Sequence, residues 1–330
     1  MSLFKNFFIA LSNSTYLNET AKKVGPKMGA NKVVAGNTIE QLIDTIERLN
    51  DKNIAVTVDN LGEFVGTVEE ATQAKNGIVQ AIKDYNVDAH MSVKLSSLGG
   101  EFDTELAYNN LREILLKANE FDNMHINIDT EKYDSLQQIV EVLDRLKGEF
   151  RNVGTVIQAY LYDAVDLIDK YPNLRLRLVK GAYKEDEQIA YQTKEEIDAN
   201  YIKIIEKRLL TAKKYTSIAT HDDQIINHVK QFVKSYNIDR DQFEFQMLYG
   251  FRSELAEDIS RQGYHFTIYV PYGNDWFGYF MRRLAERPQN LALAYQEFVS
   301  TKTLKKIGVF TSLGLGAAFI ISGLTRLLKR

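Results

Sequence analysis

The stretch LRLRLVKGAY, residues 174–183, alternates leucine with arginine before it reaches a Lys-Gly pair. Alternation with a period of two is typical of a β-strand, whose successive side chains point to opposite faces of the sheet. Arginine is rarely buried without a partner. The arginines of this strand therefore either lie at a sheet edge that faces water or hold an anionic group.

Short apolar and β-branched runs like this one recur along the chain and predict eight strands. They are Ile54–Val58, His90–Ser97, His125–Thr130, Thr155–Tyr160, Leu174–Gly181, Thr216–Asp222, Phe243–Gly250 and His265–Gly273. Segments with helical periodicity, such as ELAYNNLREILLKANEF, separate them. Regular alternation of strand and helix predicts an α/β protein, specifically a TIM-type (β/α)8 barrel with N-terminal helices and an apolar C-terminal helix.

The composition of the 330 residues limits the class of protein. Apolar residues make up 45% and charged residues 26%, which is typical of a globular chain. A net charge of −3 gives no electrostatic reason to expect a nucleic-acid partner. The chain has no cysteine, which excludes disulfides, thiolate metal sites and cysteine nucleophiles. We expect a helical segment at residues 1–50, the barrel at 51–303 and an apolar tail at 304–330.

Ionisable and polar residues collect late in the predicted strands. They are Lys94, Asp129, Gln158, Arg177, Lys180, Thr220, His221, Asp222, Gln246, Tyr269 and Tyr272. In a barrel these ends lie on one face, where barrel enzymes place their sites. Arg177 can therefore point into the barrel mouth towards a negatively charged partner. A rim salt bridge for Arg177, and a buried structural ion pair between Lys94 and Asp129, are the alternatives.

An arginine pair follows the last strand in YGNDWFGYFMRRLAERP. On a helix, Tyr279, Arg282, Arg283 and Glu286 share one broad face. Two neighbouring guanidiniums repel each other unless an anion lies beside them, and each offers a planar fork that suits a carboxylate. A solvated basic patch is the alternative, but a helix after the eighth strand borders the barrel mouth.

Several motifs occur in an order that resembles the proline dehydrogenase family. They are MSVKLSSLG, NIDTEKY, IQAYL, RLVKGAY, ATHD, EFQMLYG, YVPYG and YFMRRLAER, between roughly Asn53 and Arg287. The resemblance implies a (β/α)8 barrel that holds FAD at the carboxyl ends of its strands. It also implies oxidation of L-proline to Δ1-pyrroline-5-carboxylate, the first step of proline degradation to glutamate. The electrons would pass through FAD to a membrane quinone.

The same resemblance implies roles for individual residues. Asp129 and Arg177 would be catalytic, with Arg177 near the reactive N5 edge of the flavin. Substrate would be bound by Lys94, Tyr183, Leu248, Tyr269, Tyr279, Arg282 and Arg283. FAD would be held by Thr130, Gln158, Arg177, Lys180, Gly181, Ala182, Thr220 and His221. Arg175 has no motif role, and we expect it to form a structural ion pair.

The C-terminal tail carries no charged residue from Ile307 to Thr325, and basic residues flank this run. As a helix, the run approaches the thickness of a bilayer's hydrocarbon core. It either packs on the barrel or associates with an anionic membrane surface. We expect a cytoplasmic enzyme that is peripheral on the inner face of the cell membrane.

Two other function classes remain open from the residues. The first is a metal-dependent barrel hydrolase that uses Asp129, His221 and Asp222. The positive charge of Lys94, Arg177 and Lys180 disfavours a cation site among the strand ends. The second is a non-catalytic membrane-associated scaffold, which the tail alone suggests and which has no need of the polar strand ends.

Overall fold

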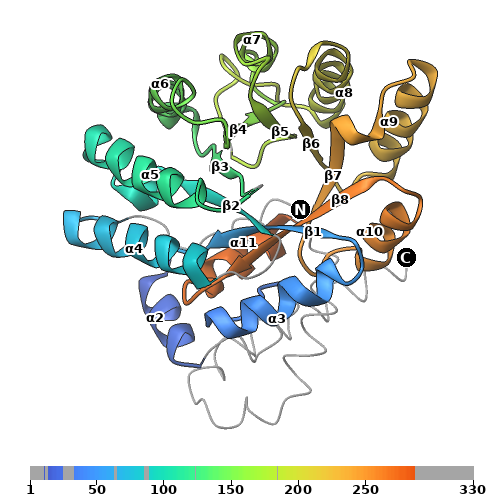
Figure 1. Ribbon diagram of the computed structural model, residues 1–330. Coiled ribbons are helices and arrows are strands. Elements are labelled where there is room, and N and C mark those ends of the chain that lie inside the picture. Colours follow the sequence, from blue (N-terminus) through green and yellow to red (C-terminus); the bar gives the residue numbers. More distant parts are fainter. Residues whose placement is uncertain are drawn as a thin grey trace, which may run out of the picture. The chain divides into compact units, whose positions relative to one another are not determined.

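The computed structural model describes residues 11, 14–24, 33–62, 65–84, 89–122, 124–183 and 185–286 (Figure 1). The chain divides into two compact units, Lys32–Trp276 and a second unit made of Met1–Asn31 with Phe277–Arg330. The second unit contains two described helices, α2 (Thr15–Val24) and most of α11 (Trp276–Glu286). The predicted division at residues 50 and 303 stays a prediction, and the tail 304–330 lies outside the described residues.

Eight parallel strands form a closed barrel in the unit Lys32–Trp276. They are β1 (Ala55–Asn60), β2 (Ala89–Lys94), β3 (Ile126–Asp129), β4 (Val153–Gln158), β5 (Arg175–Val179), β6 (Thr216–Ala219), β7 (Phe243–Leu248) and β8 (His265–Tyr272). Each strand pairs with the next along the chain, and β1 pairs with β8 from Ala55 opposite Thr267 to Asn60 opposite Tyr272. The predicted barrel is confirmed.

Helices surround this barrel, as Figure 1 shows. They are α3 (Ile39–Asn50), α4 (Val68–Asp84), α5 (Thr104–Ala118), α6 (Leu136–Leu146), α7 (Ala164–Lys170), α8 (Lys194–Thr211), α9 (Asp223–Ser235) and α10 (Ser253–Arg261). Short 3₁₀ turns lie at Ser96–Leu98, Tyr133–Ser135 and Arg240–Gln242. Side-chain caps stabilise several helix N-termini. Thr38 caps α3, Asp103 caps α5, and Thr193 forms a capping box with Glu196 at the start of α8.

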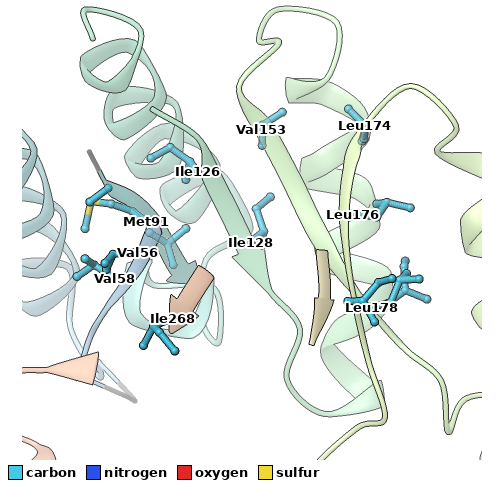
Figure 2. Packing of buried hydrophobic residues seen from close by; sticks show 14 of the residues in the cluster. Val56, Val58, Met91, Ile126, Ile128, Val153, Leu174, Leu176, Leu178 and Ile268 are labelled. Carbon is cyan, nitrogen blue, oxygen red and sulfur yellow. The ribbon is translucent and has the colours of Figure 1, made fainter. Parts of the chain in front are cut away.

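The hydrophobic core fills the layer between the strands and the helices. Leu176 and Leu178 of β5 are fully buried there, and Figure 2 labels further buried side chains from β1, β2, β3, β4 and β8. Arg175 and Arg177, which alternate with these leucines, form hydrogen bonds with residues of other strands across the barrel. The period-two alternation of this stretch therefore separates an apolar outer face from a charged inner face.

One buried arginine joins the starts of two strands. Arg208 of α8 is fully buried, and its guanidinium donates to the backbone oxygens of Tyr171 and Leu174 and to the Thr216 hydroxyl. Burial lowers the pKa of Arg208 to about 10. These hydrogen bonds replace the hydration that the guanidinium loses, so the charge is tolerated in the core.

Candidate active site

The carboxyl ends of the strands bring buried polar side chains together from around the barrel. Each of them is less than a tenth exposed: Asp59, Asp129, Gln158, Arg177, Thr220 and Gln246. Barrel enzymes place their catalytic groups at this end, and buried polar groups need partners there. The mouth of the barrel is therefore the candidate active site.

A buried ion pair lies at the centre of this mouth. Arg177 Nη1 is 2.7 Å from Asp129 Oδ1, although β5 and β3 are not adjacent strands. The Tyr269 hydroxyl donates to Asp129 Oδ2 over 2.9 Å, and Asn127 Nδ2 donates to Oδ1 over 2.9 Å. Both oxygens of this carboxylate are thus engaged, and Asp129 fixes the positions of Arg177 and Tyr269.

The Arg177 guanidinium has a buried N–H donor without a partner in the described part of the chain. Its Nη2 donates to Ser92 Oγ over 2.9 Å and to Thr57 Oγ1 over 3.3 Å. The guanidinium carbon lies 5.3 Å from the centre of the Tyr269 ring. Its Nε is buried and has no hydrogen-bond partner among the described residues. A ligand with an acceptor atom can therefore complete the hydrogen bonding of Arg177.

Lys94 pairs with a carboxylate that the sequence reasoning missed. Lys94 Nζ lies 2.8 Å from Asp59 Oδ1, and the Asp59 side chain is 4% exposed. The alternative ion pair between Lys94 and Asp129 is therefore wrong, because Asp129 faces Arg177. Burial raises the pKa of Tyr269 well above its usual value, and the carboxylates of Asp129 and Asp59 raise it further. Tyr269 is therefore a hydrogen-bond donor at neutral pH.

A second polar cluster lies deeper in the barrel around Glu244 of β7. Its carboxylate accepts from Arg175 over 2.8 Å and from the hydroxyls of Ser217 and Thr267 over 2.6 Å each. Burial alone would raise the pKa of Glu244, but Arg175 and these donors outweigh burial and lower it to about 2. The structural ion pair predicted for Arg175 is confirmed.

Comparison with known proteins identifies the family. The sequence profile described as "Proline dehydrogenase" matches residues 42–294. Proline dehydrogenase 2 of Bacillus subtilis (strain 168) is 43% identical over 297 residues, which are 88% of this chain and 97% of that protein. Proline dehydrogenase of Deinococcus radiodurans is 39% identical over 279 residues, 81% of this chain and 89% of that protein. The chain belongs to the proline dehydrogenase family.

Solved structures share the barrel. Proline utilization A from Bdellovibrio bacteriovorus, inactivated by N-propargylglycine, superposes with a TM-score of 0.72 at 23% identity. The match covers 84% of this chain but 34% of that one, so this chain spans about a third of the larger protein. At this identity the likeness concerns the fold, and it agrees with the proline dehydrogenase barrel predicted from the motifs.

Residues with predicted flavin roles in a proline dehydrogenase surround the same mouth. Gln158 donates to the Glu131 carbonyl, and Thr130 Oγ1 is buried without a hydrogen-bond partner in the described part of the chain. Thr220 Oγ1 accepts from the Asp222 backbone, and His221 Nε2 accepts from the backbone N–H of Leu248. These side chains lie at or just after the carboxyl ends of β3, β4 and β6, and their roles toward a flavin stay predictions.

The loop after β5 carries the other predicted cofactor residues. Lys180 lies beside the carboxylates of Asp222, at 3.1 Å, and Asp198. Gly181 has a φ of +109°, and a Cβ added there would lie 1.8 Å from the Tyr160 ring. Gly181 therefore has a backbone conformation that only glycine adopts without strain. Ala182 and Tyr183 follow it and are exposed.

The arginine pair lies on α11, a helix as predicted. Tyr279 is buried and Arg282 is half-buried within the second unit. The side chain of Arg283 is outside those that the structure describes. The substrate roles of these three residues in a proline dehydrogenase therefore stay predictions.

The alternative metal hydrolase finds no support. Asp129 faces Arg177, Asp222 faces Lys180, and His221 accepts from a backbone N–H. Among the described residues, no group of three or more histidine or carboxylate side chains could hold a metal ion.

None of the helices in the described part of the chain combines the length and apolar character that crossing a membrane requires.

Proposed function

We propose that this protein oxidises L-proline to Δ1-pyrroline-5-carboxylate with FAD and passes the electrons to a membrane quinone. Membership of the proline dehydrogenase family supports the substrate and the reaction. The observation that carries the proposal is the buried Arg177, which Asp129 holds in place while its Nε lacks a partner among the described residues.

The side chains at the mouth fit a flavin. Arg177 Nε is a buried donor, while Gln246 Oε1 and Thr130 Oγ1 are buried oxygens, and all three lack hydrogen-bond partners in the described part of the chain. Leaving such groups without partners costs free energy, so a bound group with both donors and acceptors suits them. An isoalloxazine ring carries both kinds of atom. When bound, FAD supplies the hydride acceptor that no protein side chain provides.

Arg177 and Asp129 take the electrostatic role in this proposal. A guanidinium fixed by a carboxylate would stabilise the negative charge that a bound flavin gains on reduction, and it would need no reorganisation during the reaction. Gln158, Thr130, Lys180, Gly181, Ala182, Thr220 and His221 are the proposed contacts to the rest of FAD.

The substrate side of the mouth would bind a small zwitterion. Lys94, held by Asp59, offers an ammonium donor, while Tyr269, whose hydroxyl is held by Asp129, and its strand partner Leu248 would pack against the ring of proline. Arg282 and Arg283 are the proposed clamp for the carboxylate of proline, and Tyr183 and Tyr279 are further proposed substrate contacts. Such a clamp would hold the carbon next to nitrogen in a fixed position, which hydride transfer to a flavin requires.

Product analysis tests the reaction. The purified protein, supplied with a dye or a short-chain quinone, is incubated with L-proline, and Δ1-pyrroline-5-carboxylate is trapped with o-aminobenzaldehyde. We expect the yellow adduct with L-proline and little with D-proline. A protein that holds FAD but forms no adduct from L-proline would contradict the proposed substrate.

The composition of the C-terminal tail bears on how the enzyme would reach a membrane quinone. We propose that residues 304–330 hold the enzyme on the inner face of the cell membrane, because the apolar run has basic flanks and a quinone is lipid-soluble. Deleting these residues should abolish co-sedimentation with vesicles that contain phosphatidylglycerol and leave proline-to-dye activity unchanged. Loss of dye activity would instead make the segment part of the catalytic fold.

A further inference from the structure

Gln246 stands directly above the buried Glu244 on β7. The two residues are two positions apart in the strand, so their side chains share the inner face of the barrel. Both are about 3% exposed. Gln246 Nε2 donates to Glu244 Oε1 over 2.5 Å. This contact ties the side chain amide of Gln246 to the deeper polar cluster.

Glu244 decides which way the amide of Gln246 faces. An ionised carboxylate only accepts hydrogen bonds, so the NH₂ group of the amide must face it. Arg175, Ser217 and Thr267 also donate to this carboxylate, which keeps it ionised. The amide oxygen of Gln246 is therefore fixed on the opposite side. Its Oε1 is buried and has no donor among the described residues.

A buried donor without a partner in the described part of the chain lies two strands away from the Gln246 oxygen. Arg177 of β5 has a buried Nε donor with no partner in the described part of the chain, and β6 separates β5 from β7. Ala219 of β6 is paired with Gln246 and lies two positions after Ser217, which reaches inward to Glu244. The small side chain of Ala219 thus stands between the strands that bear a spare donor and a spare acceptor.

The oxidised isoalloxazine ring complements this pair. It has a single N–H group, at N3, and the adjacent ring edge offers the acceptors O4 and N5. We propose that Gln246 recognises the flavin by accepting a hydrogen bond at Oε1 from the N3–H group. This inference rests on the proposed binding of FAD, and it assigns Gln246 as the residue that hydrogen-bonds to the pyrimidine end of the ring.

Affinity measurements on two proteins and two flavins test the assignment. Apoprotein is titrated with FAD and with 3-methyl-FAD, which lacks the N3–H, and binding is followed by flavin fluorescence. Loss of one buried hydrogen bond should weaken FAD binding to Gln246→Leu about tenfold relative to the unsubstituted protein. The same protein should bind 3-methyl-FAD about tenfold more weakly than FAD, whereas Gln246→Leu should bind the two flavins alike.

The controls separate this inference from the proposed function. Gln231→Leu changes an exposed glutamine of α9 and should leave both affinities unchanged. If Gln246→Leu does not fold, the preference of the unsubstituted protein for FAD over 3-methyl-FAD still decides. An equal affinity for both flavins, or the same preference in Gln246→Leu, would overturn the role of Gln246 and leave FAD binding intact. A protein that binds no FAD at all would instead contradict the proposed function.

Discussion

Asp129 receives hydrogen bonds from both Arg177 and Tyr269: Arg177 Nη1 lies 2.7 Å from Oδ1 and the Tyr269 hydroxyl 2.9 Å from Oδ2. These residues come from β3, β5 and β8, so one carboxylate orients groups from three parts of the barrel. The arrangement fixes a cation and a phenol next to each other, with the Arg177 guanidinium carbon 5.3 Å from the centre of the Tyr269 ring.

Replacing this carboxylate with an amide tests its role. An amide oxygen cannot serve both donors with the strength of a carboxylate, and hydrogen bonds to charged groups are worth roughly 1.5–3 kcal/mol. We expect Asp129→Asn to lower kcat/KM for L-proline about 10- to 100-fold. Asp134→Asn, at an exposed position of the next turn, should match the unsubstituted enzyme. Equal activity of the two variants would remove Asp129 from the mechanism.

The ion pair between Asp59 and Lys94 predicts a separate effect on substrate. Without its 2.8 Å partner, the Lys94 ammonium loses the group that holds it at the mouth. We expect Asp59→Asn to lower kcat/KM for L-proline about tenfold and to leave the FAD content of the purified protein unchanged. Loss of FAD with normal kcat/KM per bound flavin would show that Lys94 serves the cofactor side.

A substitution at Gly181 tests whether the loop after β5 requires glycine at this position. An alanine there combines a positive φ with a Cβ 1.8 Å from the Tyr160 ring, so backbone or ring must move. We expect Gly181→Ala to weaken FAD binding and to lower the free energy of unfolding by more than about 1 kcal/mol. Gly148→Ala is the matched control, because a Cβ there meets nothing within 4 Å. If both variants behave alike, the loop after β5 adapts freely.

The deeper cluster predicts how stability depends on pH. Burial, together with the charge of Arg175, whose Nη1 lies 3.0 Å from His90 Nε2, lowers the pKa of His90 from an ordinary value of 6.5 to about 3. As the pH falls below about 6.5, His90 binds a proton in the unfolded chain but stays neutral in the folded protein. The free energy of unfolding should therefore decrease from pH 6.5 towards pH 3, by at most roughly 1.4 kcal/mol per pH unit from this residue.

Urea unfolding between pH 7 and pH 4 measures this dependence. His90→Asn should make this slope shallower. An unaltered slope in His90→Asn would mean that other groups cause the loss of stability in acid.

The barrel was predictable because its signal is local and repeated. The alternation in LRLRLV separates the two faces of β5, and the recurrence of similar runs gives the eight strands even where the bounds differ by a residue or two. The ion pair of Arg175 was expected because this arginine has no role in the family motifs, and a buried arginine needs an acidic partner.

The pairing of charges across the barrel was less predictable. Arg177 contacts Thr57, 120 residues away, because closure of the barrel between β1 and β8 brings the inner faces together. Sequence reasoning considered Lys94 with Asp129 and overlooked Asp59. A signal was available, since Asp59 ends the apolar run IAVTV just as Asp129 ends HINI. Which carboxylate meets which cation depends on strand order, and spacing along the chain does not encode it.

The most direct test is the absorbance spectrum of the purified protein between 300 and 600 nm, recorded without oxygen before and after addition of L-proline. The account predicts flavin bands that bleach with L-proline and persist with D-proline. Flavin bands that L-proline leaves unchanged would contradict proline as the reductant, and a colourless protein that FAD cannot reconstitute would contradict a flavin at Arg177.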